Sequence, residues 1–179
     1  MHQTPWPKML AAGERLLPYR FEGYWRDVGT ITSLWDANMD MLSPDLINLY
    51  DPNWPISARS PICPPHQVGS HAEILHSIVT EGCEIDGIVD NSVLSPSVHI
   101  GVGANIKYSV LMPGVVVEAG ASVEYAIVGE NTVIRAGAKV GASPAPGEEK
   151  CITTIGPDLE IPAGSTVKVG AMISSSEEV

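Results

Sequence analysis

The sequence predicts a mainly β protein whose larger part is a parallel β-helix of hexapeptide repeats. Three observations predict it: a small residue recurs two positions before an aliphatic one, these pairs recur every five or six residues, and the chain of 179 residues holds 17 glycines and 15 prolines. A spacing of two indicates a strand with both side chains on one side, and a spacing of six indicates a corner after each short strand. A three-sided solenoid with aliphatic side chains stacked inside satisfies both.

The repeat is continuous from Ser77 onward, with a 17-residue unit that recurs three times. The aliphatic positions are Leu94, Ile100, Ile106, Leu111, Val117, Val123, Val128, Ile134 and Val140. The small positions are Ser92, Val98, Ala104, Ser109, Val115, Ala121, Ala126, Thr132 and Ala138. A shorter unit extends the pattern backward, and four aliphatics extend it forward to Ile173. We expect about five coils, with residues 141–151 as an excursion because proline, glycine and charge interrupt the repeat there.

The segment before the repeat has a different period. Residues 8–17 and 33–42 have apolar side chains at helical spacing, and the aromatic-rich segment 19–28 between them suits a strand. Ser33 followed by Asp36 suggests a capping box for the second helix. The proline-rich stretch that follows has no sustained period and reads as a linker. We therefore expect three parts, residues 1–44, 45–70 and 71–179.

Composition excludes several classes of function. The net charge is −11 with ten lysines and arginines, which repels nucleic acid and acidic membrane surfaces. Cys63, Cys83 and Cys151 form no CxxC or Cys/His pattern, so we expect free thiols and no zinc site. The sequence contains no signal-peptide pattern and no apolar run long enough to cross a membrane. The expected location is the cytoplasm.

Residues 19–42, YRFEGYWRDVGTITSLWDANMDML, resemble the segment that closes the nucleotidyltransferase domain of bacterial glucose-1-phosphate adenylyltransferases. The connector and the repeat resemble the C-terminal left-handed β-helix of the same family. The resemblance implies a left-handed β-helix preceded by a short α/β remnant of the nucleotidyltransferase domain. It also implies the family's reaction, which joins ATP and glucose 1-phosphate to give ADP-glucose and pyrophosphate for glycogen synthesis.

Site residues follow from the same resemblance. The family's WxDxGT-type motif places Asp27 as one of two carboxylates that hold Mg²⁺ against the phosphates, with Trp25 and Gly29 shaping the substrate edge. The family's glycine-rich nucleotide loop has no counterpart in these 179 residues. We therefore expect a C-terminal portion that holds no complete catalytic set and is inactive alone.

The resemblance further implies roles for the β-helix in homo-oligomerisation and in the response to a phosphorylated metabolite effector. Arg135 and Lys139 are the candidate cationic positions for that effector. The helix–strand–helix segment, severed from its sheet, leaves Phe21, Tyr24, Trp25 and Trp35 without their usual cover. We expect such aromatics to pack on the β-helix or on a partner chain, or not to order.

Other functions stay open at this point. Hexapeptide β-helices also form acyltransferases with a catalytic histidine, for which His66, His71, His76 and His99 are available. His99 falls between Val98 and Ile100, hence on the outside of a coil. Trimeric carbonic anhydrases of similar fold need three zinc-binding histidines. A non-catalytic regulatory subunit of the same pathway is a further alternative.

Overall fold

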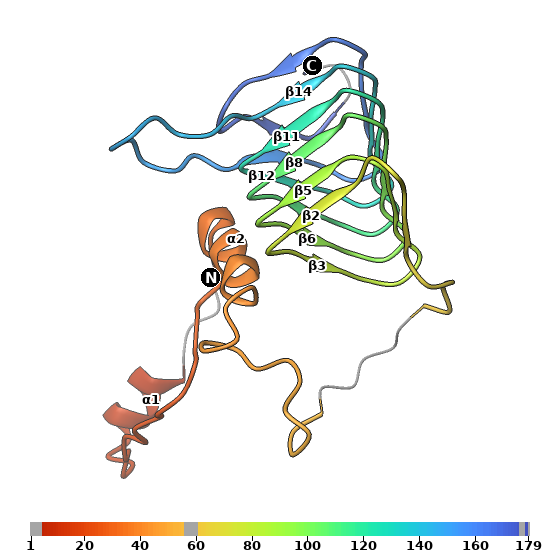
Figure 1. Cartoon of the computed structure of the whole chain (residues 1–179). Coiled ribbons are helices and arrows are strands. Elements are labelled where there is room, and N and C mark those ends of the chain that lie inside the picture. Colours follow the sequence, from red (N-terminus) through yellow and green to blue (C-terminus); the bar gives the residue numbers. More distant parts are fainter. Residues whose placement is uncertain (1–4, 56–60, 176–177, 179) are drawn as a thin grey trace.

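The structure is a computed structural model that describes residues 5–55, 61–175 and 178. Its larger part winds into a three-sided solenoid whose faces are three parallel sheets of six strands each (Figure 1). Sheet A comprises β1 (Gln67–Val68), β4 (Glu84–Ile85), β7 (His99–Ile100), β10 (Val116–Val117), β13 (Val133–Ile134) and β16 (Glu160–Ile161). Sheet B comprises β2 (Glu73–Leu75), β5 (Ile88–Asp90), β8 (Asn105–Lys107), β11 (Ser122–Glu124), β14 (Lys139–Val140) and β17 (Thr166–Val167). Sheet C comprises β3 (Ile78–Val79), β6 (Val93–Leu94), β9 (Val110–Leu111), β12 (Ala126–Val128), β15 (Thr153–Ile155) and β18 (Met172–Ile173).

The interior of the solenoid holds the residues that the repeat predicts. All nine aliphatic positions and all nine small positions named above are fully buried. The strand register stacks like on like, for example Val117 between Ile100 and Ile134. The β-helix prediction is confirmed, and the burial of so many aliphatic side chains provides most of its stability.

The solenoid is longer than expected, because each sheet has six strands where about five coils were predicted. The additional coil begins at β1, which lies within the predicted linker and before the expected boundary at residue 71. β1 pairs with β4 in register, with Gln67 opposite Glu84. Its triplet, His66-Gln67-Val68, lacks the small residue two positions before the aliphatic one, so the sequence pattern did not reveal this strand.

Buried serines link successive coils beside sheet C. The Ser77 hydroxyl accepts a hydrogen bond from the backbone N–H of Ser92, and the Ser92 hydroxyl accepts one from the N–H of Ser109. The Ser109 hydroxyl in turn accepts from the N–H of Ala126 at 3.2 Å. These side chains satisfy corner amides that would otherwise be buried without partners.

The predicted excursion is present. Val128 pairs with Ile155, 27 residues later, whereas Leu111 pairs with Val128 at the 17-residue spacing of the repeat. The additional residues, 141–151, form a loop that projects from the solenoid between β14 and β15 (Figure 1).

The N-terminal segment differs from prediction in three ways. Helix α1 spans Trp6–Ala11 instead of 8–17, because Gly13 adopts φ +71° and ends it. Helix α2 spans Ile31–Asp40, and its capping box lies one turn earlier than predicted, between Thr30 and Ser33. The predicted strand at 19–28 is absent, since this extended segment pairs with no other strand in the described chain.

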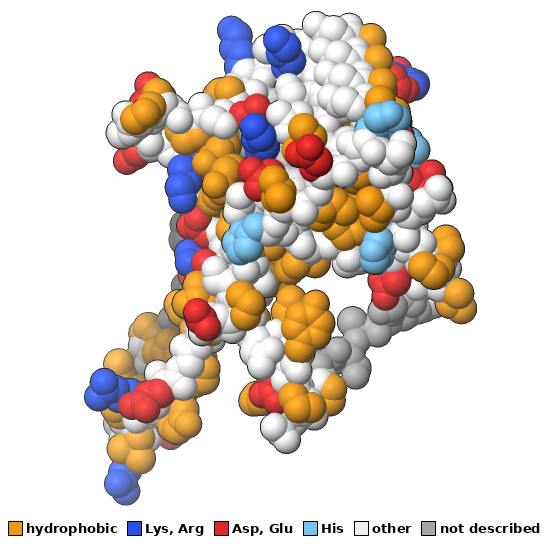
Figure 2. Space-filling model, in the orientation of Figure 1, with side chains coloured by type: hydrophobic (Ala, Val, Ile, Leu, Met, Phe, Trp, Pro, Cys, Tyr) orange, Lys and Arg blue, Asp and Glu red, His pale blue; other side chains and the backbone are white. Residues whose placement is uncertain are grey.

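The arm formed by residues 5–28 projects away from the solenoid (Figure 1) and exposes several large apolar side chains, which appear in orange at the lower left of Figure 2. They include Trp6, Leu10, Leu17, Tyr19 and Phe21. These side chains gain no cover from the β-helix, whereas Trp35, in helix α2, packs on sheet C. Cover of the exposed aromatics by a partner chain stays a prediction.

Candidate functional site

Helix α2 is anchored to the β-helix by its apolar face. Trp35 is 3% exposed and packs against Val110 and Ile127 on the outer face of sheet C. Its indole N–H donates a 2.7 Å hydrogen bond to the carbonyl of Tyr108. This part of the sheet face is apolar because the outward positions of β3, β6, β9 and β12 are also aliphatic, so it needs a helix to cover it.

Two stacked tyrosines complete this contact. Tyr108 and Tyr125 occupy the same corner in successive coils, both with positive φ, and their ring centroids lie 4.9 Å apart. The ring of Trp35 stacks on Tyr125 at 5.7 Å. From the projecting loop, the Lys150 ammonium lies 5.1 Å from the centre of the Trp35 ring, within the range of a cation–π interaction.

The polar face of α2 holds the Trp25–Asp27 segment. Arg26 Nε donates a 2.7 Å hydrogen bond to Asp40, and its Nη2 forms an ion-pair contact with the same carboxylate oxygen at 2.6 Å. Its Nη1 donates to Asp36 at 3.3 Å. The Tyr24 hydroxyl donates to the same Asp40 carboxylate at 2.9 Å. Hydrogen bonds with Tyr24 and Asp40 raise the pKa of Arg26, so the guanidinium stays protonated.

Asp27 follows this anchored arginine directly. One of its carboxylate oxygens accepts the backbone N–H of Gly29 at 3.1 Å, which folds the chain into a short turn before α2. A cavity of about 690 Å³ opens beside it, lined by Gly23, Tyr24, Trp25, Arg26, Asp27, Asp40, Asp45 and Leu46. Trp25 is 74% exposed at its rim. The structure thus brings two of the predicted site residues, Trp25 and Asp27, into one open cavity.

The described residues around Asp27 do not form a complete set of metal ligands. Within the described ranges, no group of three or more His, Cys, Asp or Glu side chains is arranged to hold a metal ion. The open arrangement fits an ion that takes one carboxylate from this edge and its other ligands from substrate and water, as Mg²⁺ commonly does.

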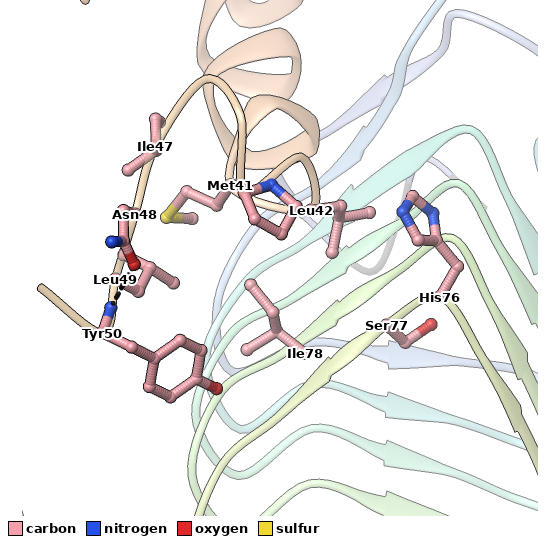
Figure 3. A pocket seen from close by; sticks show the side chains of 10 residues that line it. Met41, Leu42, Ile47, Asn48, Leu49, Tyr50, His76, Ser77 and Ile78 are labelled. Atoms are coloured by element: carbon pink, nitrogen blue, oxygen red, sulfur yellow. Dashed lines mark hydrogen bonds between the residues drawn. The ribbon is translucent and has the colours of Figure 1, made fainter.

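A second cavity, of about 210 Å³, lies between the connector after α2 and the first coil (Figure 3). Its labelled walls include Met41, Leu42, Leu49, Tyr50 and Ile78. None of its described lining residues is Lys, Arg, Asp or Glu, and its one titratable nitrogen group is the imidazole of His76, which is hydrogen-bonded to Asn91 at 2.7 Å.

The predicted effector residues lie far along the solenoid. Arg135 bonds Glu118 at 2.7 Å and Glu160 at 2.8 and 2.9 Å, so its guanidinium already bridges three successive coils of sheet A. Lys139 is exposed on sheet B. The two residues therefore point from different sheets, and their effector role stays a prediction.

The position of His99 and the state of the cysteines agree with the sequence predictions. His99 is exposed on the outside of β7, 3.3 Å from Glu84, as predicted. All three cysteines are free thiols. Burial raises the pKa of the Cys83 thiol, which keeps it protonated and unreactive. No helix in the described part of the chain has the length and apolar character needed to cross a membrane.

Sequence reasoning missed the residues that hold the site. Asp36 and Asp40 are spaced one helical turn apart on the face opposite Trp35 and Met39, which is a signal that the sequence contains. A second signal is the pair of adjacent aliphatic residues in β3, β6, β9 and β12, such as Val110-Leu111, which marks a sheet with apolar side chains on both faces.

A hexapeptide β-helix preceded by this edge defines a class of protein in which a nucleotidyltransferase segment is joined to a repeat domain. A family model described as "GlmU-like, C-terminal hexapeptide" matches residues 64–156, and a model described as "Nucleotidyl transferase" matches residues 3–44. The first match covers more than half of the chain, which therefore belongs to the GlmU-like C-terminal hexapeptide family. The match fits the left-handed winding that the family resemblance implies.

The curated relatives agree with one another. The chain is 50% identical over 102 residues to a glucose-1-phosphate adenylyltransferase of Clostridium perfringens (strain SM101 / Type A), a match that covers 56% of this chain and 26% of the relative. It is 49% identical over 96 residues to the enzyme of that name from Clostridium acetobutylicum, covering 53% and 25%. It is 48% identical over 101 residues to that from Clostridioides difficile (strain 630), covering 56% and 26%. The chain thus matches about a quarter of the length of these relatives.

Proposed function

We propose that this chain supplies the C-terminal part of a glucose-1-phosphate adenylyltransferase, which makes ADP-glucose and pyrophosphate from ATP and glucose 1-phosphate. The observation that carries the proposal is the combination of a Trp25–Gly29 edge with a β-helix in a chain 50% identical over 102 residues to an enzyme of that name. In this reaction a phosphate oxygen of glucose 1-phosphate attacks the α-phosphorus of ATP. The bond from that phosphorus to the bridging oxygen breaks, and pyrophosphate leaves with its electron pair.

Asp27 is the proposed metal carboxylate. One oxygen is engaged by Gly29, and the other accepts no hydrogen bond from the described residues. Mg²⁺, when bound, supplies charge neutralisation and orders the attacking and leaving oxygens. Trp25 forms an apolar wall of the cavity, and the Gly29 turn fixes the direction of the Asp27 side chain.

The chain on its own is proposed to be inactive. An edge that carries only part of a catalytic set cannot orient two substrates, and orientation accounts for much of such catalysis. The cavity contains one cation, Arg26, and that guanidinium is already bound to Asp40. The β-helix would then serve assembly of a homo-oligomer and the response to a phosphorylated effector, with Arg135 and Lys139 as the candidate contacts.

The acyltransferase alternative has less support. His71 pairs with Asp86 at 3.1 Å and His76 with Asn91 at 2.7 Å, both at the surface of the solenoid. The connector after α2 borders the cavity of about 210 Å³ that holds His76, and the described lining of that cavity contains no carboxylate or second histidine to assist it. An acyl-donor binding measurement with acetyl-coenzyme A would separate this alternative from the adenylyltransferase.

The test joins this chain to the parts of the Clostridium perfringens relative that lie outside the matched region. Pyrophosphate release is then measured with ATP, glucose 1-phosphate and Mg²⁺. We expect release by the fusion and none by the 179-residue chain. A fusion that retains the β-sheet circular dichroism and melting of the chain but releases no pyrophosphate would overturn the proposal.

A further inference from the structure

Helix α2 has two faces with separate partners. Trp35 and Met39 belong to the apolar cluster on sheet C, whereas Asp36 and Asp40 contact Arg26. Because α2 is fixed to the β-helix by Trp35, the two aspartates occupy defined positions relative to the solenoid. The segment that contains Tyr24 and Arg26 contacts these aspartates and is therefore also held at a defined position relative to the solenoid.

Asp40 is the better enclosed of the two acids. Its side chain is only 15% exposed, against 32% for Asp36. Its Oδ2 accepts hydrogen bonds from Arg26 Nε at 2.7 Å and from the Tyr24 hydroxyl at 2.9 Å, and Arg26 Nη2 forms an ion-pair contact with the same oxygen at 2.6 Å. Short, charge-assisted hydrogen bonds to a shielded carboxylate are stronger than an ordinary surface ion pair.

The segment that Asp40 holds has few other restraints. Residues 19–28 pair with no strand in the described chain, and Trp25 and Val28 are exposed. Tyr24 and Arg26 lie on alternate positions of this extended segment, so both reach the same carboxylate. Asp27, the next residue, has only its local turn with Gly29 to orient it.

We propose that Asp40 is a positioning residue that holds the Tyr24–Asp27 segment on α2, and thereby sets where the Asp27 carboxylate lies relative to the β-helix. The inference rests on the proposed function in its assignment of Asp27 to the metal. Arg26 then holds this segment to α2 and does not serve as a phosphate ligand, because its three guanidinium nitrogens contact Asp36 or Asp40. A displacement of about 1 Å at such a group is enough to slow phosphoryl transfer severely.

The first experiment tests the contact between Asp40 and the Tyr24–Asp27 segment in the 179-residue chain, and it requires no enzymatic activity. Trypsin cleaves after Arg26 only when this segment opens, whereas Arg20 is exposed and serves as an internal reference. We expect Asp40→Ala to raise the cleavage rate at Arg26, relative to that at Arg20, by about tenfold. Asp40→Glu keeps the charge and should restore part of the protection. Asp45→Asn, which removes an acid of the same cavity that does not bond Arg26, is the matched control and should leave the ratio unchanged.

The second experiment tests the consequence for Asp27 in the fusion with the Clostridium perfringens relative. The Mg²⁺ concentration for half-maximal pyrophosphate release should rise about tenfold in Asp40→Ala and recover in Asp40→Glu. A general loss of folding would lower the melting temperature and the maximal rate without this selective change in the Mg²⁺ requirement. Retention of the melting transition of the β-helix confirms that the variants fold.

The outcomes separate the two proposals. An inactive wild-type fusion contradicts the proposed function. The contact between Asp40 and the Tyr24–Asp27 segment is then tested by the trypsin result alone. An active fusion in which Asp40→Ala changes neither the cleavage ratio nor the Mg²⁺ requirement overturns the positioning role. A changed cleavage ratio with an unchanged Mg²⁺ requirement also overturns it, because Asp27 would then be placed independently of Asp40.

Discussion

The indole nitrogen of Trp35 donates a 2.7 Å hydrogen bond to the carbonyl oxygen of Tyr108, which ties helix α2 to a corner of the β-helix. The residues are 73 positions apart in the chain, and no continuous secondary structure links them. The contact makes the position of the candidate edge depend on the solenoid. Loss of this contact should therefore displace the Trp25–Gly29 segment from the β-helix.

Removal of this anchor should release α2 while the β-helix stays folded. Trp35→Ala removes the ring that covers sheet C and should cost about 3–5 kcal/mol of docking free energy. Trp35→Phe removes only the N–H donor and should cost about 1 kcal/mol. Because both substitutions remove the Trp35 fluorophore, release of α2 is measured by amide hydrogen exchange over Ile31–Asp40, which should rise in Trp35→Ala while the strands of the β-helix stay protected. Trp54→Phe, at an exposed position, is the control and should leave this exchange unchanged.

The hydrogen bonds that link Ser77, Ser92, Ser109 and Ala126 in successive coils, here called the serine ladder, predict a stability effect in the solenoid. Ser109→Ala leaves the buried N–H of Ala126 without its acceptor and should lower the free energy of unfolding by about 1–3 kcal/mol. Urea denaturation followed by circular dichroism measures this change. Ser122→Ala, on the outer face of β11, should change it by less than about 0.5 kcal/mol. Equal effects at the two positions would contradict the ladder.

Two corner glycines should differ in their tolerance of alanine. At Gly129 an added Cβ would lie 2.5 Å from the backbone of Gly156, so adjacent coils would have to separate. At Gly120 the surrounding space is open, and the cost is the φ of +67°, about 1–2 kcal/mol. Gly129→Ala should therefore lower the melting temperature more than Gly120→Ala. A reversed order would show that coil spacing is looser than described.

The Glu118–Arg135–Glu160 bridge predicts a pH dependence. Hydrogen bonds from Arg135 lower the pKa of both glutamates below their ordinary value of 4.5. Because the folded pKa is depressed, the bridge stabilises the fold above pH 4.5, and that contribution is lost as the pH falls through the folded pKa values. Thermal unfolding between pH 7 and pH 3 measures this slope, which Arg135→Met should flatten.

Lys139→Met is the matched control, since Lys139 forms no ion pair with the described residues. It should keep the wild-type slope below pH 4.5. A slope unaffected by Arg135→Met would mean that other carboxylates, such as Asp86 beside His71, dominate acid unfolding.

The solenoid was predictable from sequence because its core repeats. Leu94, Ile100 and Ile106 each face the interior for the same reason, so one pattern places all of them. The loop at 141–151 was predictable because it breaks that pattern. The early coil at β1 was not, since it rests on pairing with β4 and not on a period of its own.

The candidate site was predictable only in part. The motif identified Trp25 and Asp27, but the acids that hold them depend on tertiary contact between an extended segment and α2. The expected strand at 19–28 failed for the same reason: a strand needs a neighbour, and here the side chains of Tyr24 and Arg26 replace backbone pairing.

The central claim is that this chain provides the metal-binding edge of an adenylyltransferase, and Asp27→Asn in the fusion protein tests it most directly. The substitution keeps the size and the turn with Gly29 but removes the charge that would hold Mg²⁺. We predict a loss of pyrophosphate release of at least about a hundredfold with an unchanged melting temperature. Full activity in the Asp27→Asn fusion would contradict the claim.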